Sequence, residues 1–285
     1  MNLVNKAYGG ATSNNEITLG TTENITIPSF HDQVVDWLAA NPSPGKFHLD
    51  NDVIQIEIGS NDILNNVMNL LNGTVTLANL ATKVATSIAT DIQSLIDAGY
   101  KNIALWNIPA IEKTPLATEL QASALVTPVV QTMNNELVLQ VNNVIDASIQ
   151  KTQNVRIFDL YSFMITCLDT QILSALGITD TADACYVADA DGSIEICNNP
   201  DEHFFYDYIH PASRIHYTWG VVAAVLTRSP STTLTTSEIL SLVSTFNIGS
   251  SDRTDNIVVD GVTPSEAAAI PNGSSSHCSC SSTTK

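Results

Sequence analysis

From about residue 50 onwards, patterns typical of buried strands alternate with patterns typical of amphipathic helices. Residues 53–58 form a β-branched run that ends at Gly59, and residues 102–106 form a second such run. Between them, apolar residues recur every three or four positions over residues 77–95, which predicts one long helix closed by Gly99. Because a strand, a helix and a strand joined in this way imply a right-handed crossover, the alternation predicts a parallel sheet covered by helices.

The alternation continues towards the C-terminus. Thr127-Pro128 predicts the start of another helix, which extends to Ile145. Residues 155–160 predict a third strand, and residues 211–227 a last helix. Since open α/β sheets carry their sites at the carboxyl ends of the strands, residues 59–62 and 107–109 are expected at the functional edge.

The composition excludes several classes of protein. The 285 residues are 44% hydrophobic, enough for a sizeable core. With 11 Lys and Arg against 29 Asp and Glu, the net charge of −18 argues against nucleic-acid partners and anionic membranes. The longest strongly apolar stretch, residues 219–226, is far too short for a membrane span. The character changes near residue 230, so we expect a domain over residues 1–230 and a flexible Ser/Thr-rich tail over residues 231–285, with one short helix at 237–246.

Three short segments carry chemistry. Asp207-Tyr208-Ile209-His210-Pro211 places a carboxylate where it can orient an imidazole that acts as a base. Gly59-Ser60-Asn61-Asp62 places an amide at a strand end, where it can donate to a developing oxyanion. In Tyr8-Gly9-Gly10-Ala11 a glycine lets a backbone N–H approach a ligand. Each segment taken alone is more often an ordinary turn or helix start.

In this order, the three segments resemble the blocks of the SGNH hydrolases, also called the GDSL esterase/lipase family, and the secreted plant and fungal branch fits best. The resemblance implies a three-layer α/β/α sandwich with a central parallel sheet, the flavodoxin-like SGNH fold. It also implies hydrolysis of carboxylic esters without a cofactor or metal, on a small-molecule or polysaccharide ester. Carried over residue by residue, His210 is the base, Asp207 orients it, and Gly10 and Asn61 donate to the oxyanion.

The chain departs from the family pattern at the nucleophile. That serine is expected in a Gly-Asp-Ser block at the end of the first strand, and the chain contains no such block. We therefore expect that the first strand and its serine are missing, that an open position lies beside residues 53–58, and that the chain as given is inactive. Ser60 is a weak substitute, because it occupies the variable position of its block. The alternative is a non-catalytic relative that binds an acylated carbohydrate or lipid.

The remaining features suggest a secreted, monomeric protein. Asp191-Gly192 predicts the turn of a hairpin, and Cys185 and Cys197 bracket that hairpin and can close it as a disulfide, which leaves Cys167 unpaired or joined to a tail cysteine. Glycosylation sequons begin at Asn24, Asn72 and, in the tail, Asn272. Residues 1–20 lack the pattern of a signal peptide, so we expect it to be lost with the missing N-terminus.

Overall fold

The fold is built around a parallel sheet between layers of helices. The computed structural model describes residues 3–22, 25–41, 52–147, 154–188 and 193–250. In the described part, β3 (Val53–Glu57), β4 (Asn102–Trp106) and β5 (Asn154–Phe158) pair in that order, all parallel. Ile56 pairs with Leu105, which pairs with Ile157. The predicted parallel sheet is therefore confirmed.

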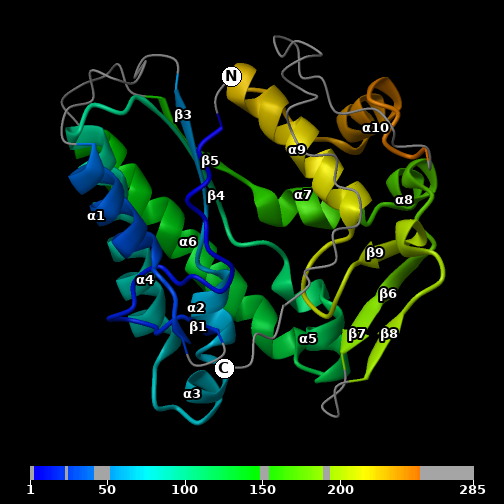
Figure 1. Ribbon diagram of the computed structural model, residues 1–285, viewed down its shortest axis with the longest axis horizontal. Helices are drawn as coiled ribbons and strands as arrows, with labels where there is room; N and C mark the ends of the chain where they lie inside the picture. Colours follow the sequence, from blue (N-terminus) through cyan, green and yellow to red (C-terminus); the bar gives the residue numbers. More distant parts are fainter. Residues whose placement is uncertain (1–2, 23–24, 42–51, 148–153, 189–192, 251–285) are drawn as a thin grey trace, which may run out of the picture.

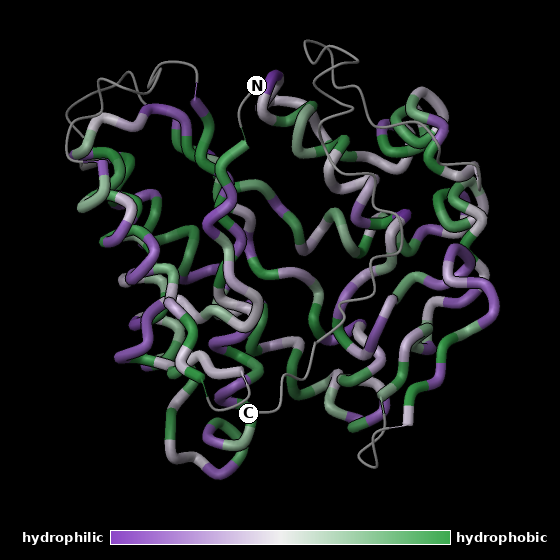
Figure 2. The backbone as a smooth tube through the Cα atoms, viewed as in Figure 1, coloured by the Kyte–Doolittle hydropathy of each residue, from purple (hydrophilic) through white to green (hydrophobic). Residues whose placement is uncertain are grey.

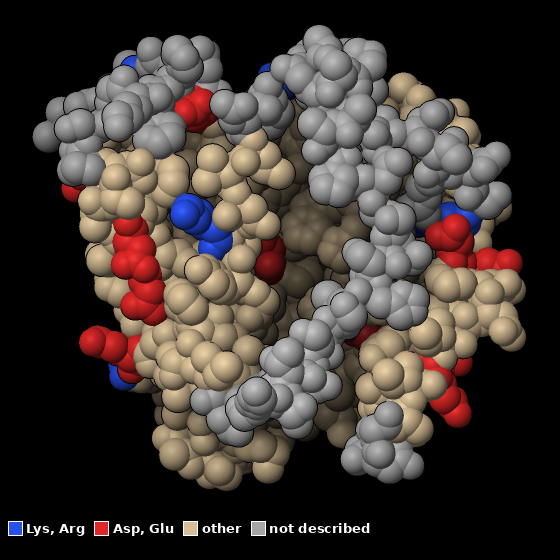
Figure 3. All heavy atoms as spheres, in the orientation of Figure 1, with Lys and Arg blue, Asp and Glu red and all other residues tan. Residues whose placement is uncertain are grey.

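Two groups of helices cover the two faces of this sheet (Figure 1). On one side lie α1 (Phe30–Ala40), α4 (Leu77–Asp97) and α6 (Ser123–Ala147). On the other side lie α7 (Leu160–Cys167), α8 (Thr170–Leu176), α9 (Ser213–Arg228) and α10 (Thr236–Thr245). Figure 3 shows the surface hollowed between these two parts of the molecule. None of the described helices is long and apolar enough to cross a membrane.

Each face of the sheet has its own hydrophobic core. Along β4, Ile103 and Leu105 pack into the core beneath α4 and α6, while Ala104 and Trp106 pack into the core beneath α9. This alternation follows from the two-residue period of a strand. Trp106 meets Trp219 of α9 edge to face, with ring centroids 5.6 Å apart. Apolar and polar residues also alternate along the helices (Figure 2), as expected for helices with one covered side.

Two expectations about single elements are corrected. Residues 53–58 were expected as a buried strand, but in β3 only Ile56 is buried and Val53 is 39% exposed. The reason is position: β3 is an edge of the described sheet and pairs with β4 alone. The helix expected from Pro128 begins at Ser123, and Pro128 lies inside α6. Pro128 has no N–H and so removes one hydrogen bond from the second turn of α6. In that turn the Thr127 hydroxyl donates to the Ser123 carbonyl (2.8 Å).

Short elements complete the described chain. Near the N-terminus, β1 (Thr21–Thr22) pairs with β2 (Ile25–Thr26). After β3 come the short helices α2 (Ser60–Leu64) and α3 (Val67–Leu71), and after β4 comes α5 (Pro115–Glu119). Towards the C-terminus, β6 (Asp180–Ala184) pairs with β9 (His203–Phe205), and β7 (Tyr186–Ala188) pairs with β8 (Ile194–Ile196).

The packed body continues past residue 230. The short helix expected at 237–246 is present as α10, and its Ile239 and Val243 are buried in the core beside α8 and α9. Those two side chains lie four positions apart on one helix face, which is why the helix docks. The segment 231–285 is thus not tail throughout: its described part, up to residue 250, packs on the domain. Residues 251–285 lie outside the described residues.

Candidate active site

The glycine segment near the N-terminus forms a tight turn. The Ala11 N–H donates to the Tyr8 carbonyl (3.2 Å), and Gly10 has a φ of +80°, in the left-handed region that favours glycine. A Cβ on Gly10 would lie 2.8 Å from Cδ1 of Ile27. Within the described residues the Gly10 N–H makes no hydrogen bond. The turn therefore presents a backbone donor that a ligand can use.

Asn61 connects the end of β3 to this turn. It lies in the first turn of α2, which begins after Gly59. Asn61 Nδ2 donates to the Ala11 carbonyl at 2.9 Å. Because a primary amide has two N–H groups, one remains for a second acceptor. This hydrogen bond holds Asn61 against Ala11, the residue that follows Gly10 in the turn.

A buried carboxylate fixes the same loop. Asp62 is fully buried and accepts hydrogen bonds from the Ser13 N–H and the Ser13 hydroxyl, both at 2.8 Å. Burial raises the pKa of Asp62 to about 6, although the Ser13 hydrogen bonds work in the opposite direction. Sequence reasoning gave Asp62 no separate role, and nothing in the local pattern pairs it with a serine 49 residues earlier.

The side chains of Asp207 and His210 are in hydrogen-bond contact, and we call this pair the dyad. His210 Nδ1 lies 2.8 Å from Asp207 Oδ2 and 3.0 Å from Oδ1. The backbone N–H groups of Ile209 and His210 also donate to Asp207 Oδ1, at 2.8 and 2.7 Å. The Leu116 N–H of α5 donates to the Tyr208 carbonyl and anchors the loop (3.0 Å). Nδ1 faces the carboxylate, Nε2 has no hydrogen bond within the described residues, and the His210 side chain is 66% exposed.

These contacts set the protonation of the dyad. Burial alone would raise the pKa of Asp207, but the hydrogen bonds from the His210 ring and from the two backbone N–H groups lower it to about 2. The hydrogen bond to Asp207 raises the pKa of His210 above its ordinary value, against a smaller opposing effect of burial. The carboxylate is therefore ionised near neutral pH, and the imidazole is a stronger base than a free histidine.

Glu57 interacts with Ser60 through a hydrogen bond and with His210 through its charge. It is the last residue of β3, and its Oε1 accepts from the Ser60 hydroxyl at 3.3 Å. Glu57 keeps some contact with solvent, but the surrounding protein atoms remove part of its hydration, and this partial desolvation raises the pKa of Glu57. The hydrogen bond from Ser60 and the charge of His210 lower this pKa. In turn, the Glu57 charge contributes to the raised pKa of His210. The charges of Glu57 and His210 therefore influence each other's protonation.

Ser60 does not contact the base. Its hydroxyl donates to Glu57, and within the described residues the ring of His210 has hydrogen bonds to Asp207 alone.

The Asn107 side chain, expected at the functional edge, donates to Asp159 and accepts from the Tyr161 N–H, both at 2.9 Å. It therefore shapes the turn after β4.

The predicted hairpin and disulfide are present. β7 and β8 pair antiparallel, and Cys185 is bonded to Cys197. The expected turn at Asp191-Gly192 lies outside the described residues. Cys167 is free and buried, and its thiol pKa is raised by that burial. Of the sequons, Asn72 is exposed, whereas Asn24 and Asn272 lie outside the described residues, so glycosylation stays a prediction.

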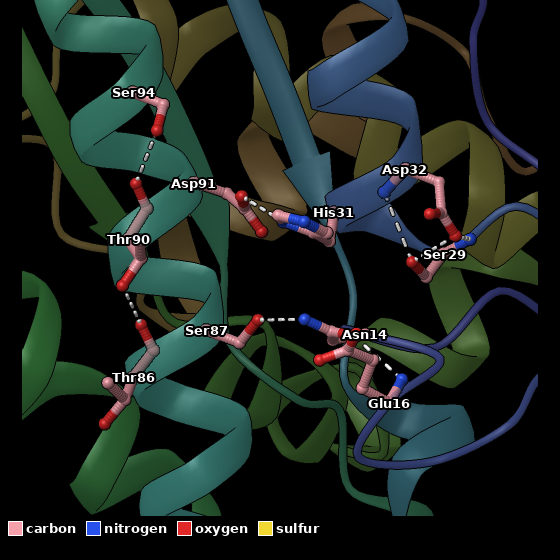
Figure 4. A network of polar contacts seen from close by, with 10 residues as sticks. All are labelled: Asn14, Glu16, Ser29, His31, Asp32, Thr86, Ser87, Thr90, Asp91 and Ser94. Atoms are coloured by element: carbon pink, nitrogen blue, oxygen red, sulfur yellow. Dashed lines mark hydrogen bonds and ion pairs between the residues drawn. The ribbon is translucent and has the colours of Figure 1, made fainter.

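Sequence reasoning missed a second histidine–carboxylate pair. No sequence spacing gives His31 a partner, yet its Nδ1 on α1 lies 2.8 Å from Oδ1 of Asp91 on α4. Figure 4 shows this pair above the hydrogen bond from Asn14 to Ser87 (3.2 Å). Both contacts hold the N-terminal segment on α4. The partners are 60 and 73 residues apart, so no local spacing reveals them.

The chain is similar to known proteins over most of its length. The model of the GDSL-like lipase/acylhydrolase family matches residues 1–220. An acetylesterase of Thermothelomyces thermophilus is 33% identical to the chain over 119 residues. The match covers 39% of this chain and 35% of the acetylesterase, so it spans about a third of that curated relative.

Proposed function

Because the chain belongs to the GDSL-like lipase/acylhydrolase family, we propose that it serves in the hydrolysis of carboxylic esters by a Ser-His-Asp mechanism. The observation that carries the proposal is the Asp207–His210 pair, with Nδ1 bound at 2.8 Å and the His210 side chain 66% exposed. The acetylesterase relative supports an ester with a small acyl group.

In the proposed mechanism, His210 moves the proton. A serine hydroxyl attacks the ester carbonyl carbon, and His210 Nε2 takes its proton as the new C–O bond forms. The carbonyl oxygen becomes an oxyanion, which accepts from the Gly10 N–H and the Asn61 amide. When the intermediate collapses, the bond to the alcohol breaks and His210 returns the proton to the leaving oxygen. Water, deprotonated by His210 in the same way, then releases the acid and restores the serine.

The nucleophile is the residue that we do not assign within this chain. No Gly-Asp-Ser block occurs in the sequence, and none of the described serines reaches the His210 ring. We propose that a serine on a strand beside β3 completes the site, since that edge of the described sheet is open. A non-catalytic role, in which the site binds an acylated ligand, is favoured by the same lack of a serine at His210.

Hydrolysis of p-nitrophenyl acetate tests the proposal. We expect the 285-residue chain to react no faster than its His210→Ala variant, because His210 activates only a nucleophile within hydrogen-bond reach. The genomic sequence upstream of Met1, translated in frame with the chain, is expected to add activity that requires His210. In that longer protein, Asn61→Ala is expected to lower the rate about a hundredfold or more.

Two results would contradict parts of this proposal. Hydrolysis by the chain as given that requires His210 and disappears in Ser60→Ala would make Ser60 the nucleophile. Inactivity of both forms, combined with binding of an acetylated ligand, would support the non-catalytic reading.

We also propose that the protein acts outside the cell, as a monomer. The Cys185–Cys197 bond is of a kind that persists in oxidising compartments, and the exposed Asn72 sequon is open to glycosylation. Mass spectrometry of the protein from the culture medium of its natural host tests this proposal. We expect an intact Cys185–Cys197 disulfide and a glycan attached to Asn72. A reduced, unglycosylated intracellular protein would contradict it.

A further inference from the structure

An exposed aromatic ring lies beside the proposed base. The chain on both sides of the dyad loop forms a short antiparallel ladder: Phe205 bridges Pro211, and the Tyr206 N–H donates to the His210 carbonyl (2.8 Å). In this register Tyr206 is directly opposite His210. Opposite residues of an antiparallel pair project from the same face, with Cβ atoms roughly 5 Å apart. Tyr206, which is 48% exposed, is therefore the neighbour of His210 on its open side.

From Tyr206, apolar side chains continue along the disulfide-closed hairpin. The rings of Tyr206 and Tyr186 are stacked, with centroids 5.5 Å apart and an interplanar angle of 14°. Tyr186 pairs across the hairpin with Ile196, and Ala188 pairs with Ile194, so all four project from one hairpin face. We call Tyr206, Tyr186, Ile196 and Ile194 the aromatic strip. Neighbouring side chains from His210 through Tyr206 and Tyr186 to Ile196 are about 5 Å apart, so Ile196 lies roughly 15 Å from His210 along the strip.

The strip is rigid and open. The Cys185–Cys197 bond lies immediately before Tyr186 and immediately after Ile196, so the two strands cannot separate. Ile194 and Ile196 are 57% and 62% exposed. Fixed, exposed apolar side chains next to a reactive group are typical of a binding surface, because little side-chain freedom is lost when a ligand binds.

The surrounding charge limits what can bind there. Residues 180–210 contain eight acidic residues and no Lys or Arg. A fatty-acid carboxylate or a phospholipid headgroup would be repelled. A neutral acyl chain on so open a surface would stay wetted along one side. A sugar ring suits the strip better, since it covers one apolar face and keeps its hydroxyl groups in water.

We propose that the aromatic strip binds the sugar rings of a carbohydrate ester and so directs its acyl group to His210. The inference rests on the proposed function, and it assigns the alcohol part of the ester to a neutral carbohydrate. A small acyl group such as acetate offers few contacts, so the alcohol part must supply most of the binding free energy.

Binding of unacetylated sugars tests the strip without any chemistry. Xylotetraose and cellotetraose, titrated into the 285-residue chain, are expected to shift the NMR signals of residues 186, 196 and 206. Tyr206→Ala is expected to weaken binding about fivefold to tenfold, the usual value of one aromatic contact. Tyr206→Phe keeps the stacked ring and is expected to bind within twofold of the parent.

A matched pair of variants controls for general surface effects. Ile196→Ser removes an apolar side chain from the strip, and Leu139→Ser removes one of similar exposure, 53%, from α6. Weaker binding is expected for Ile196→Ser, and no change for Leu139→Ser. Near-ultraviolet circular dichroism checks that each variant keeps the parent fold.

The outcomes separate this inference from the proposed function. If the upstream-extended protein hydrolyses p-nitrophenyl acetate through His210 but no tetrasaccharide shifts the strip signals, the strip proposal is wrong and the ester hydrolase stands. If the sugars bind through Tyr206 but no form is hydrolytic, the strip stands and the proposed mechanism fails. Saturable binding of tributyrin, and of neither sugar, would also overturn the assignment to carbohydrate.

Discussion

Replacing Asp62 with asparagine should change how stability depends on pH. Burial raises the pKa of Asp62 from 3.8 to about 6. The difference of about 2 pKa units corresponds to about 3 kcal/mol, at about 1.4 kcal/mol per unit. The folded state therefore holds the carboxyl proton of Asp62 more tightly than the unfolded state does. This difference makes its full contribution to the free energy of unfolding below pH 3.8. That contribution is lost as the pH rises through about 6.

Asparagine removes the titration but keeps the contacts. Its carbonyl oxygen still accepts from the Ser13 N–H, and its amide donates to the Ser13 hydroxyl, which can reverse its role. We therefore expect the stability of Asp62→Asn, relative to the parent, to rise by up to about 3 kcal/mol between pH 4 and pH 7. Other titrating groups cancel in this difference.

Urea unfolding followed by tryptophan fluorescence at pH 4, 5, 6 and 7 measures the effect. Asp32→Asn is the control of opposite sign, because hydrogen bonds from Ser29 lower the pKa of Asp32. Because this pKa lies below 3.8, the control is measured between about pH 3 and 5, where the relative stability of Asp32→Asn should fall as the pH rises. A stability difference for Asp62→Asn that does not change with pH would show that burial does not perturb Asp62, and the reasoning would be refuted.

Three further outcomes are expected. Asp207→Asn should lower the pKa of His210 in an NMR titration, because its main hydrogen-bond partner loses its charge; an unchanged pKa would remove Asp207 from the dyad. Gly10→Ala should cost about 1–2 kcal/mol in urea unfolding, since its φ of +80° strains any other residue. Ile239→Ala should cost about 2–5 kcal/mol and Ser241→Ala less than about 0.5 kcal/mol. Equal effects at these two positions would mean that α10 is not docked.

Periodicity and short motifs predicted the features that are local in sequence. The helix over 77–95, the strands at 102–106 and 155–160 and the turn of Asp207 towards His210 each depend on residues within a few turns of one another. The start of α6 was misplaced, because Thr127-Pro128 is a good helix start and the structure extends the helix one turn before it.

Contacts between distant segments could not be predicted from the pattern. Ser13 with Asp62 and His31 with Asp91 depend on how α1 and α2 pack, and the partners are 49 and 60 residues apart. The unpaired edge of β3 agrees with the open position expected beside residues 53–58, although the run itself was expected to be buried. An apolar, β-branched run indicates a strand, but whether both of its edges are paired depends on the rest of the sheet.

The two hydrophobic cores make the geometry of the proposed site sensitive to substitutions in either core. Ala11 and Ile63, beside the oxyanion donors, belong to the core under α4, whereas Phe204 and Phe205, which lead into the dyad loop, belong to the core under α9. The residues proposed as oxyanion donors and as base are thus attached to opposite faces of the sheet. A substitution in either core can shift one face against the other while each half keeps its own hydrogen bonds. Since a misplacement of about 1 Å can lower a rate about a hundredfold, catalysis would register such a shift long before unfolding does.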